Sequence, residues 1–346
     1  LAEIAMRINI KWIRLLGILL LFTACQSNEN QPSEKPNKLF TVVSPEVSGL
    51  DFTNILEETI ESNYYRYLYT YIGGGVAAGD INNDGLIDLY FTSNSTGDRL
   101  YLNKGELQFE DVTSRAGIEH REGFNTGVTM ADVNADGFLD IYVSRGGWKE
   151  EDNKFANLLY INNGDETFTE KAAEHGLADT NRSIQATFFD YDNDNDLDVY
   201  VSNTPNVTGR SQITDLLELG KDPAMMQQKG CDRLYENDGT GYFTDVSIRA
   251  GLVYDTGFGL NPQVVDLNSD GWLDLYVCND FNYPDLVYIN NKDKTFTQAR
   301  DEVVQHMSFN SMGSDAADIN NDGLIDLMTL DMNPEDYIRS KTTMTM

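Results

Sequence analysis

The chain has 346 residues and a formal net charge of −31, from 56 acidic and 25 basic residues. A surface this acidic repels phosphate backbones, so these numbers exclude a typical nucleic-acid-binding protein. The length is sufficient for one large repeat domain with a sizeable core.

The N-terminus has the pattern of an export signal. Three basic residues precede an apolar run at residues 15–22, which is too short to span a bilayer, and small residues then lead to Cys25. A cysteine in this place resembles a bacterial lipoprotein signal; a plain secretory signal with an incidental cysteine is the alternative. We predict a signal peptide over residues 1–25, lipidation at Cys25 and a polar tether over residues 26–38. The protein would then be exported to the bacterial cell envelope as an outer-membrane lipoprotein, with the lipid as its membrane contact.

From residue 80 onward the chain repeats one nine-residue acidic loop five times: residues 80–88 (loop 1), 132–140 (loop 2), 190–198 (loop 3), 266–274 (loop 4) and 318–326 (loop 5). Positions 1, 3, 5 and 9 carry Asp or Asn in every copy. Oxygen side chains in a tight turn can surround one hard cation, and Ca²⁺, with its six to eight oxygen ligands, fits best. A single loop of this kind could also be an acidic β-turn without metal.

Position 6 of the loop requires left-handed backbone, so Gly stands there in four copies and Asn195 in the third. Position 7 would offer its backbone carbonyl. We predict up to five structural Ca²⁺ ions, with these side-chain ligands: Asp80, Asn82, Asp84 and Asp88; Asp132, Asn134, Asp136 and Asp140; Asp190, Asp192, Asp194 and Asp198; Asp266, Asn268, Asp270 and Asp274; Asp318, Asn320, Asp322 and Asp326.

Each loop lies inside a longer pattern of four strands. A stretch rich in small residues precedes most copies, as at residues 73–79, and an apolar strand follows. A third strand comes next, and a fourth begins at an aromatic residue: Phe109, Phe168, Phe243 or Phe296. Four strands in 50-odd residues are typical of β-propeller blades, with the small residues on the innermost strand. An EF-hand is excluded, because loop position 12 falls inside a strand and is never Glu.

The loops, together with the stretches GGGVAAGDINNDGLIDLYFTSN and TLDMNPEDYIRSKTTM, resemble the FG-GAP/VCBS-repeat β-propellers. That family is related to the integrin α-subunit head and to cartilage-acidic-protein-like secreted proteins, and its long bacterial surface members commonly carry a C-terminal ASPIC/UnbV-type module, which is absent here. The resemblance implies an all-β propeller domain over residues 39–346, with the loops between first and second strands. Family members typically have seven blades, whereas this chain shows four complete units and a truncated fifth. Either residues 40–72 add strands that close a smaller ring or, as we expect, the propeller is incomplete.

No catalytic motif accompanies the repeats. His120, His175 and His306 are scattered, and the chain has no Gly-x-Ser-x-Gly elbow, zinc spacing or glycine-rich phosphate loop. We predict a non-enzymatic, calcium-stabilised, surface-tethered module that mediates binding or adhesion to a protein or polysaccharide. The alternative is the propeller part of a glycan-processing lipoprotein enzyme or of an uptake system.

Two segments are candidate partner surfaces. One is the insertion between Asn203 and Asp232, and the other is residues 279–285; a decoration of the blade rim and a simple strand connection are the alternatives. Cys231 and Cys278 could pair in an exported protein or be two separate buried thiols.

Overall fold

The computed structural model describes residues 39–332 except 119–120, 148–154, 206–229, 253–256, 281–283, 305–307 and 309. Residues 44–346 form one compact unit, separate from residues 1–43. The lipidation site, the tether and most of the insertion after Asn203 therefore lie outside the described residues. Within the described ranges, none of the helices has the length and apolarity needed to cross a membrane.

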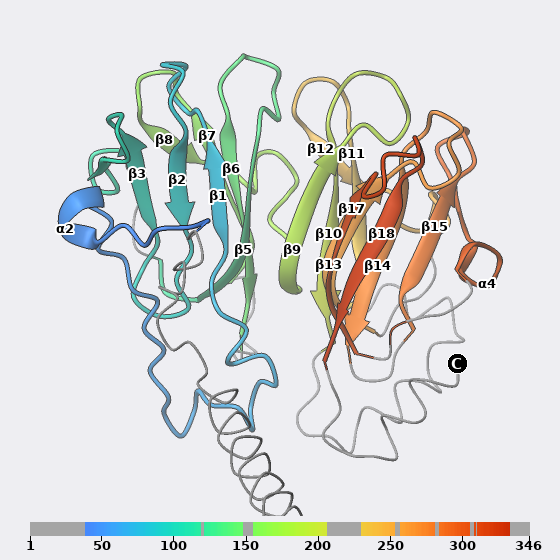
Figure 1. Ribbon diagram of the computed structural model, residues 1–346, viewed down its shortest axis with the longest axis horizontal. Coiled ribbons are helices and arrows are strands. Elements are labelled where there is room, and N and C mark those ends of the chain that lie inside the picture. Colours follow the sequence, from blue (N-terminus) through green and yellow to red (C-terminus); the bar gives the residue numbers. More distant parts are fainter. Residues whose placement is uncertain are drawn as a thin grey trace, which may run out of the picture. The chain divides into compact units, whose positions relative to one another are not determined.

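The described chain forms five antiparallel sheets, four of them four-stranded and each built from consecutive strands (Figure 1). Their strands are β1 (Val76–Gly79), β2 (Asp88–Phe91), β3 (Arg99–Asn103) and β4 (Phe109–Asp111) in blade 1; β5 (Phe124–Ala131), β6 (Asp140–Gly146), β7 (Leu158–Asn162) and β8 (Phe168–Glu170) in blade 2; β9 (Arg182–Phe189), β10 (Asp198–Thr204), β11 (Arg233–Asn237) and β12 (Phe243–Asp245) in blade 3; β13 (Phe258–Val265), β14 (Asp274–Asp280), β15 (Leu286–Asn290) and β16 (Phe296–Gln298) in blade 4; and β17 (Ser311–Ala317) and β18 (Asp326–Asp331) in blade 5. Two short helices are α2 (Pro45–Ser48) and α4 (Arg300–Val303).

The core lies between successive blades. Tyr90 of blade 1 packs in one apolar cluster with Ile141 and Val143 of blade 2, and similar clusters join blade 2 to blade 3 and blade 3 to blade 4. Because a second strand is covered by neighbours on both faces, every residue of β10 and β14 is buried. The stacked four-stranded sheets confirm the predicted propeller architecture.

The inner strands β1, β5, β9, β13 and β17 are neighbours in that order. In blades 1 and 2 they approach closely at the position five residues before the loop, where Gly75 and Gly127 stand. A methyl group on Gly75 would lie 2.9 Å from the Thr126 carbonyl oxygen and 3.1 Å from the Gly127 Cα. One on Gly127 would overlap the carbonyl oxygen of Ile184 in β9. The packing of the inner strands therefore requires the small residues Gly75 and Gly127.

The segment before β1 contributes no strand among its described residues 39–75. The interpretation that residues 40–72 close a smaller ring with strands of their own is therefore wrong. Instead, Tyr67 and Tyr69 pack against apolar residues at the starts of the inner strands of blades 2, 3 and 4. The Tyr69 hydroxyl also donates a hydrogen bond to Asp280 Oδ2 at 3.2 Å. Residues 64–72, which we call the aromatic segment, thus join three blades at one end of their inner strands.

Candidate functional site

Each acidic loop connects an inner strand to the second strand of its blade, as predicted. Position 6 has the expected left-handed backbone, with φ between 75° at Asn195 and 91° at Gly137. Position 4 is left-handed as well, although it is never Gly; Ala135 has φ 57° and Ser269 has φ 59°. This second left-handed residue was not predicted, because Ala and Ser rarely adopt that conformation.

Backbone amides hold the side chains of positions 1 and 5 toward the inside of the loop. In loop 1, Asp80 accepts hydrogen bonds from the amides of Asp84 (3.1 Å) and Gly85 (2.8 Å). Asp84 Oδ1 accepts one from the Leu86 amide at 2.8 Å. Loops 2 to 5 make the same bonds. Since each oxygen has two lone pairs, these bonds fix the carboxylates and still leave them able to bind a cation.

Position 9 has a different environment, because its carboxylate is completely buried in loops 1 to 4. In loop 2, Asp140 Oδ1 accepts the amide of Asn162 at 2.8 Å and Oδ2 accepts the amide of Val133 at 3.1 Å. Burial raises the pKa of Asp140 to about 7, despite these two amide bonds. Asp198 in loop 3 has the same two bonds and the same raised pKa, about 7, for the same reason. Position 9 therefore ties the loop to the third strand, a role that was not predicted beside that of a ligand.

Loop 3 brings three carboxylates together. One oxygen each of Asp190, Asp192 and Asp194 lies within 4.8 Å of the others. The Asp192 side chain is only 1% exposed, and within the described structure its Oδ1 has no hydrogen-bond partner. A buried carboxylate oxygen without a donor is unfavourable, and a divalent cation would satisfy it. The residues of loop 3 thus fit a bound Ca²⁺, which would supply charge neutralisation there.

A second set of polar residues was missed by the sequence reasoning. The residue just before the third strand bonds the buried tyrosine of the second strand in blades 1 to 4. In blade 1 the Tyr90 hydroxyl donates to Asp98 Oδ2 at 2.7 Å, and Asn125 of blade 2 donates to the same carboxylate at 2.8 Å. The equivalent tyrosine partners in blades 2 to 4 are Asn157, Asp232 and Asp285. A repeated Asp or Asn ahead of each third-strand motif was the available signal.

A third set consists of the asparagines that end the third strands. Asn162 Nδ2 donates to the carbonyl of Ile81 in loop 1 at 2.8 Å and to that of Leu139 in loop 2 at 3.1 Å. Asn237 joins loops 2 and 3 in the same way, and Asn290 joins loops 3 and 4. These amide bridges fix the spacing between consecutive loops.

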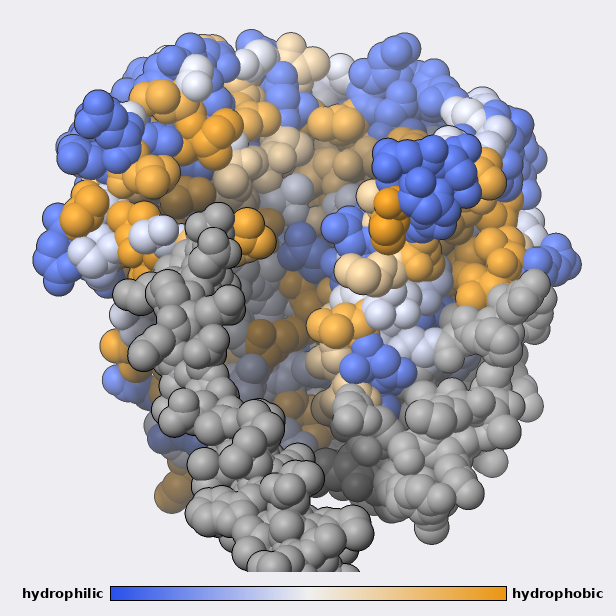
Figure 2. Space-filling view, viewed as in Figure 1, coloured by the Kyte–Doolittle hydropathy of each residue, from blue (hydrophilic) through white to orange (hydrophobic). Residues whose placement is uncertain are grey.

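Two cavities in the described structure are large enough for a small ligand, and no residue of an acidic loop lines either of them. One of about 640 Å³ lies among the inner strands and is lined by residues of all five blades, such as Gln185 and Asn261, and by Tyr64 and Tyr71. The two tyrosine rings stack with centroids 6.2 Å apart. The face seen in Figure 2 is hollowed between the regions of β1 and β17, which lie on either side of it in Figure 1.

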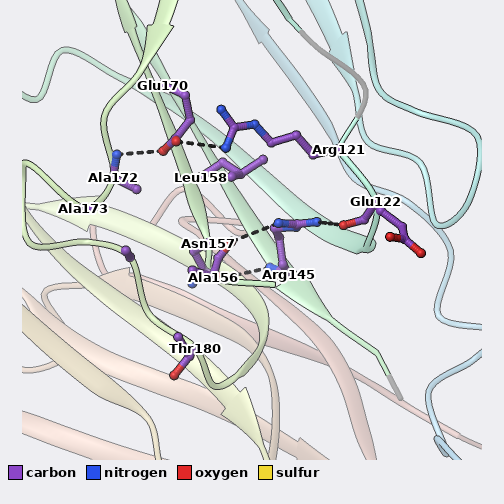
Figure 3. A pocket seen from close by; sticks show the side chains of 11 residues that line it. Arg121, Glu122, Arg145, Ala156, Asn157, Leu158, Glu170, Ala172, Ala173 and Thr180 are labelled. Carbon is purple, nitrogen blue, oxygen red and sulfur yellow. Dashed lines mark hydrogen bonds and ion pairs between the residues drawn. The ribbon is translucent and has the colours of Figure 1, made fainter. Parts of the chain in front are cut away.

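The other cavity, of about 550 Å³, lies beside blade 2 (Figure 3). The arginines that line it form hydrogen bonds or ion pairs with other residues of the protein. Arg145 donates to the carbonyls of Glu122 (2.6 Å) and Ala156 (3.3 Å), and Arg121 pairs with Glu170 at 3.1 Å. These contacts hold the loops around β6 and β7 in place.

The remaining candidates have structural roles where they are described. His175 Nδ1 lies 2.5 Å from the carbonyl oxygen of Gly241 and so joins blade 2 to blade 3. His120 and His306 lie outside the described residues. Cys231 and Cys278 are both buried and are not joined by a disulfide, so the possibility that they pair is not realised.

The chain matches the family model of the FG-GAP-like repeat over residues 80–143, 150–201 and 266–329, just over half of its length. The chain belongs to the FG-GAP-like repeat family. This confirms the resemblance seen in the loops. This FG-GAP-like repeat protein is 32% identical to cartilage acidic protein 1 of Xenopus tropicalis over 138 residues, covering 39% of this chain and 20% of that protein. Its identity to the Homo sapiens protein of the same name is 26% over 207 residues, covering 59% and 28%. The chain thus spans less than a third of the length of these relatives.

Two solved structures also resemble this FG-GAP-like repeat protein. One is an Agrocybe aegerita lectin that recognises non-reducing terminal N-acetylglucosamine, with a TM-score of 0.41, 19% identity and coverage of 75% of this chain and 60% of that one. The other is a Bacillus licheniformis rhamnogalacturonan lyase, with a TM-score of 0.33, 15% identity and coverage of 73% and 50%. Neither likeness is strong enough to assign a ligand or a reaction to this chain.

Proposed function

We propose that this chain is a calcium-stabilised, non-enzymatic binding module that is exported and tethered to the cell surface through Cys25. The observation that carries the calcium part of the proposal is the hydrogen-bonded arrangement of carboxylates in repeated loops, above all the cluster around the buried Asp192 side chain in loop 3. Two unit charges 4 Å apart repel by about 4 kcal/mol at an effective dielectric constant of 20. Loops that concentrate at least three carboxylates each are therefore expected to be more stable with a divalent cation than without one.

The cavity of about 640 Å³ among the inner strands supports a binding role. Its walls combine stacked tyrosine rings with the amide side chains of Gln185 and Asn261. Aromatic faces together with a few polar groups are typical of sites for small polar ligands, including sugars. A segment of a polysaccharide or a loop of a surface protein is the ligand that we propose.

The polar side chains near the cavity beside blade 2 are already paired, which favours a structural role for them over a catalytic one. The arginines and Glu170 of the cavity beside blade 2 are paired with each other or with backbone carbonyls. His175 is held between two blades. We therefore infer that these groups stabilise the folded propeller and do not take part in catalysis.

Thermal unfolding of the purified chain with a chelator and with millimolar Ca²⁺ tests the metal part of the proposal. Extracellular calcium modules bind at roughly 10⁻⁴–10⁻³ M, so the melting temperature should rise by several degrees over that range. Asp136→Asn, which removes one loop charge, should reduce the rise. Asp165→Asn is the matched control, because Asp165 lies in an exposed turn of the same blade and bonds only Thr167 in the described structure.

A melting temperature that does not depend on Ca²⁺ would contradict the metal part. For the binding part, the chain should retain members of a glycan or surface-protein array, and Tyr71→Ala should weaken that retention. Turnover of any polysaccharide would instead favour a glycan-processing enzyme.

A further inference from the structure

The hairpin between the third and fourth strands of a blade reaches the acidic loop of the preceding blade. The residue that makes this contact always lies four positions after the asparagine that ends the third strand. In blade 2 it is Glu166, whose Oε1 lies 3.4 Å from Asn82 Nδ2 of loop 1. In blade 3 it is Gly241, where a methyl group would lie 3.3 Å from the Asn134 Cβ of loop 2. In blade 4 it is Lys294, which faces loop 3.

Loop 3 is also the loop with the most carboxylates. It alone has Asp rather than Asn at position 3, and it alone has a carboxylate at position 7, Asp196. The Lys294 ammonium forms an ion pair with Asp192 Oδ2 and lies 3.8 Å from Asp194 Oδ2. Among loops 1 to 3, the most acidic loop is therefore the one that receives a positive charge from the following blade.

Lys294 does not satisfy the whole cluster. The buried Asp192 Oδ1 has no hydrogen-bond partner in the described part of the chain, and the same is true of Asp196 Oδ1. The lysine side chain is 47% exposed, and its ammonium also lies 3.2 Å from Glu236 Oε1. It can therefore leave the loop carboxylates and remain paired with Glu236.

We propose that Lys294 is a built-in cation for loop 3, which competes with Ca²⁺ for the carboxylates of Asp192 and Asp194. This inference rests on the proposed calcium function. A lysine ammonium neutralises one charge of the cluster when calcium is absent, so loop 3 stays ordered. When calcium is present, the ammonium must be displaced, so loop 3 binds the ion more weakly than its number of carboxylates suggests.

The neighbouring loops provide the contrast. Loop 1 receives no positive charge from Glu166, whose own charge is paired with Arg115 at 3.1 Å. Loop 2 faces Gly241, which has no side chain. The hairpin of the following blade thus gives loops 1 to 3 different electrostatic environments, although they share one motif. Loop 4 has a lysine from its own blade, because Lys292 Nζ lies 3.3 Å from Asp270 Oδ2.

Lys294→Gln tests the inference, with calcium titrations by calorimetry and melting curves with and without Ca²⁺. The dissociation constant of one site should fall by up to about fivefold, the largest change expected when one partly exposed competing ion pair is lost. The melting temperature should fall in chelator and recover in calcium. Lys104→Gln is the control, because Lys104 lies on the equivalent hairpin of blade 1 and pairs with Glu110 at 3.1 Å.

The affected site is assigned by repeating the change in an Asp190→Asn/Asp194→Asn background. There, Lys294→Gln should no longer alter calcium binding. A melting temperature lowered equally with and without calcium, or an unchanged dissociation constant, would show that Lys294 is only a structural ion pair and would overturn the inference. Absence of calcium binding by the wild-type chain would instead overturn the proposed function itself.

Discussion

The contact between inner strands can be tested by adding a single methyl group. In Gly127→Ala, the new Cβ would overlap the Ile184 carbonyl oxygen and the end of the Gln185 side chain, and it would lie 3.1 Å from the Gln185 Cα. The Gln185 side chain can rotate away, but the carbonyl can move only with β9. We therefore expect a loss of about 2–3 kcal/mol in the free energy of unfolding, at the upper end of what overpacking costs.

Blade 5 supplies the matched control. Gly313 also lies five residues before its loop, yet a methyl group there would meet no atom of the described structure within 4 Å. Gly313→Ala should be neutral or slightly stabilising, because Ala loses less backbone freedom than Gly on folding. Melting curves followed by circular dichroism in saturating Ca²⁺ should place Gly127→Ala roughly 4–10 °C below Gly313→Ala. Equal melting temperatures for the two variants would refute the close approach of β5 and β9.

Two further predictions concern buried polar contacts. Burial raises the pKa of Asp285 to about 6, above its value of about 3.9 in an unfolded chain, so its contribution to the free energy of unfolding is fully present below pH 4 and is lost as the pH rises to 6. Asp285→Asn copies Asn157, which stands at the equivalent position of blade 2. In urea unfolding, the decrease in the free energy of unfolding between pH 4 and 7 should be smaller by about 2 kcal/mol in this variant than in the wild type. The same pH profile in both proteins would contradict the raised pKa of Asp285. Tyr69→Phe removes a donor to the buried Asp280 and should cost about 1–2 kcal/mol, measured by denaturant unfolding. The exposed Tyr65, changed to Phe, should cost nothing measurable; equal effects would argue against the role of the aromatic segment.

The parts of the fold that could be predicted from sequence are those written in short, repeated stretches. The loop motif fixes a turn through its left-handed position 6, and the apolar strand after it follows directly in the chain. The fourth strands begin at Phe109, Phe168, Phe243 and Phe296, as predicted. Repetition made these patterns recognisable, because a turn that occurs by chance would not recur five times at the same position before a strand.

Contacts between segments far apart in the chain could not be predicted in the same way. The bond from Asn125 to Asp98 and the amide bridge from Asn162 to Ile81 each join two blades. The acidic residues had all been interpreted through the loops, so Asp98 was not singled out. The aromatic segment has no strand or helix periodicity, and only its position against three inner strands shows what its tyrosines do.

The amide bridges have a consequence for how such a molecule can change in size. Asn162, Asn237 and Asn290 form the same connection at three successive blade boundaries. In the described structure, the Asn103 side-chain amide of blade 1 donates instead to the Ile87 carbonyl of its own loop. The blades at these boundaries therefore share one acceptor, the carbonyl at loop position 2, and one donor, the side-chain amide of the asparagine that ends the third strand. A duplicated blade would contain both the donor and the acceptor of this hydrogen bond. The number of blades could therefore increase without a change of sequence in the neighbouring blades.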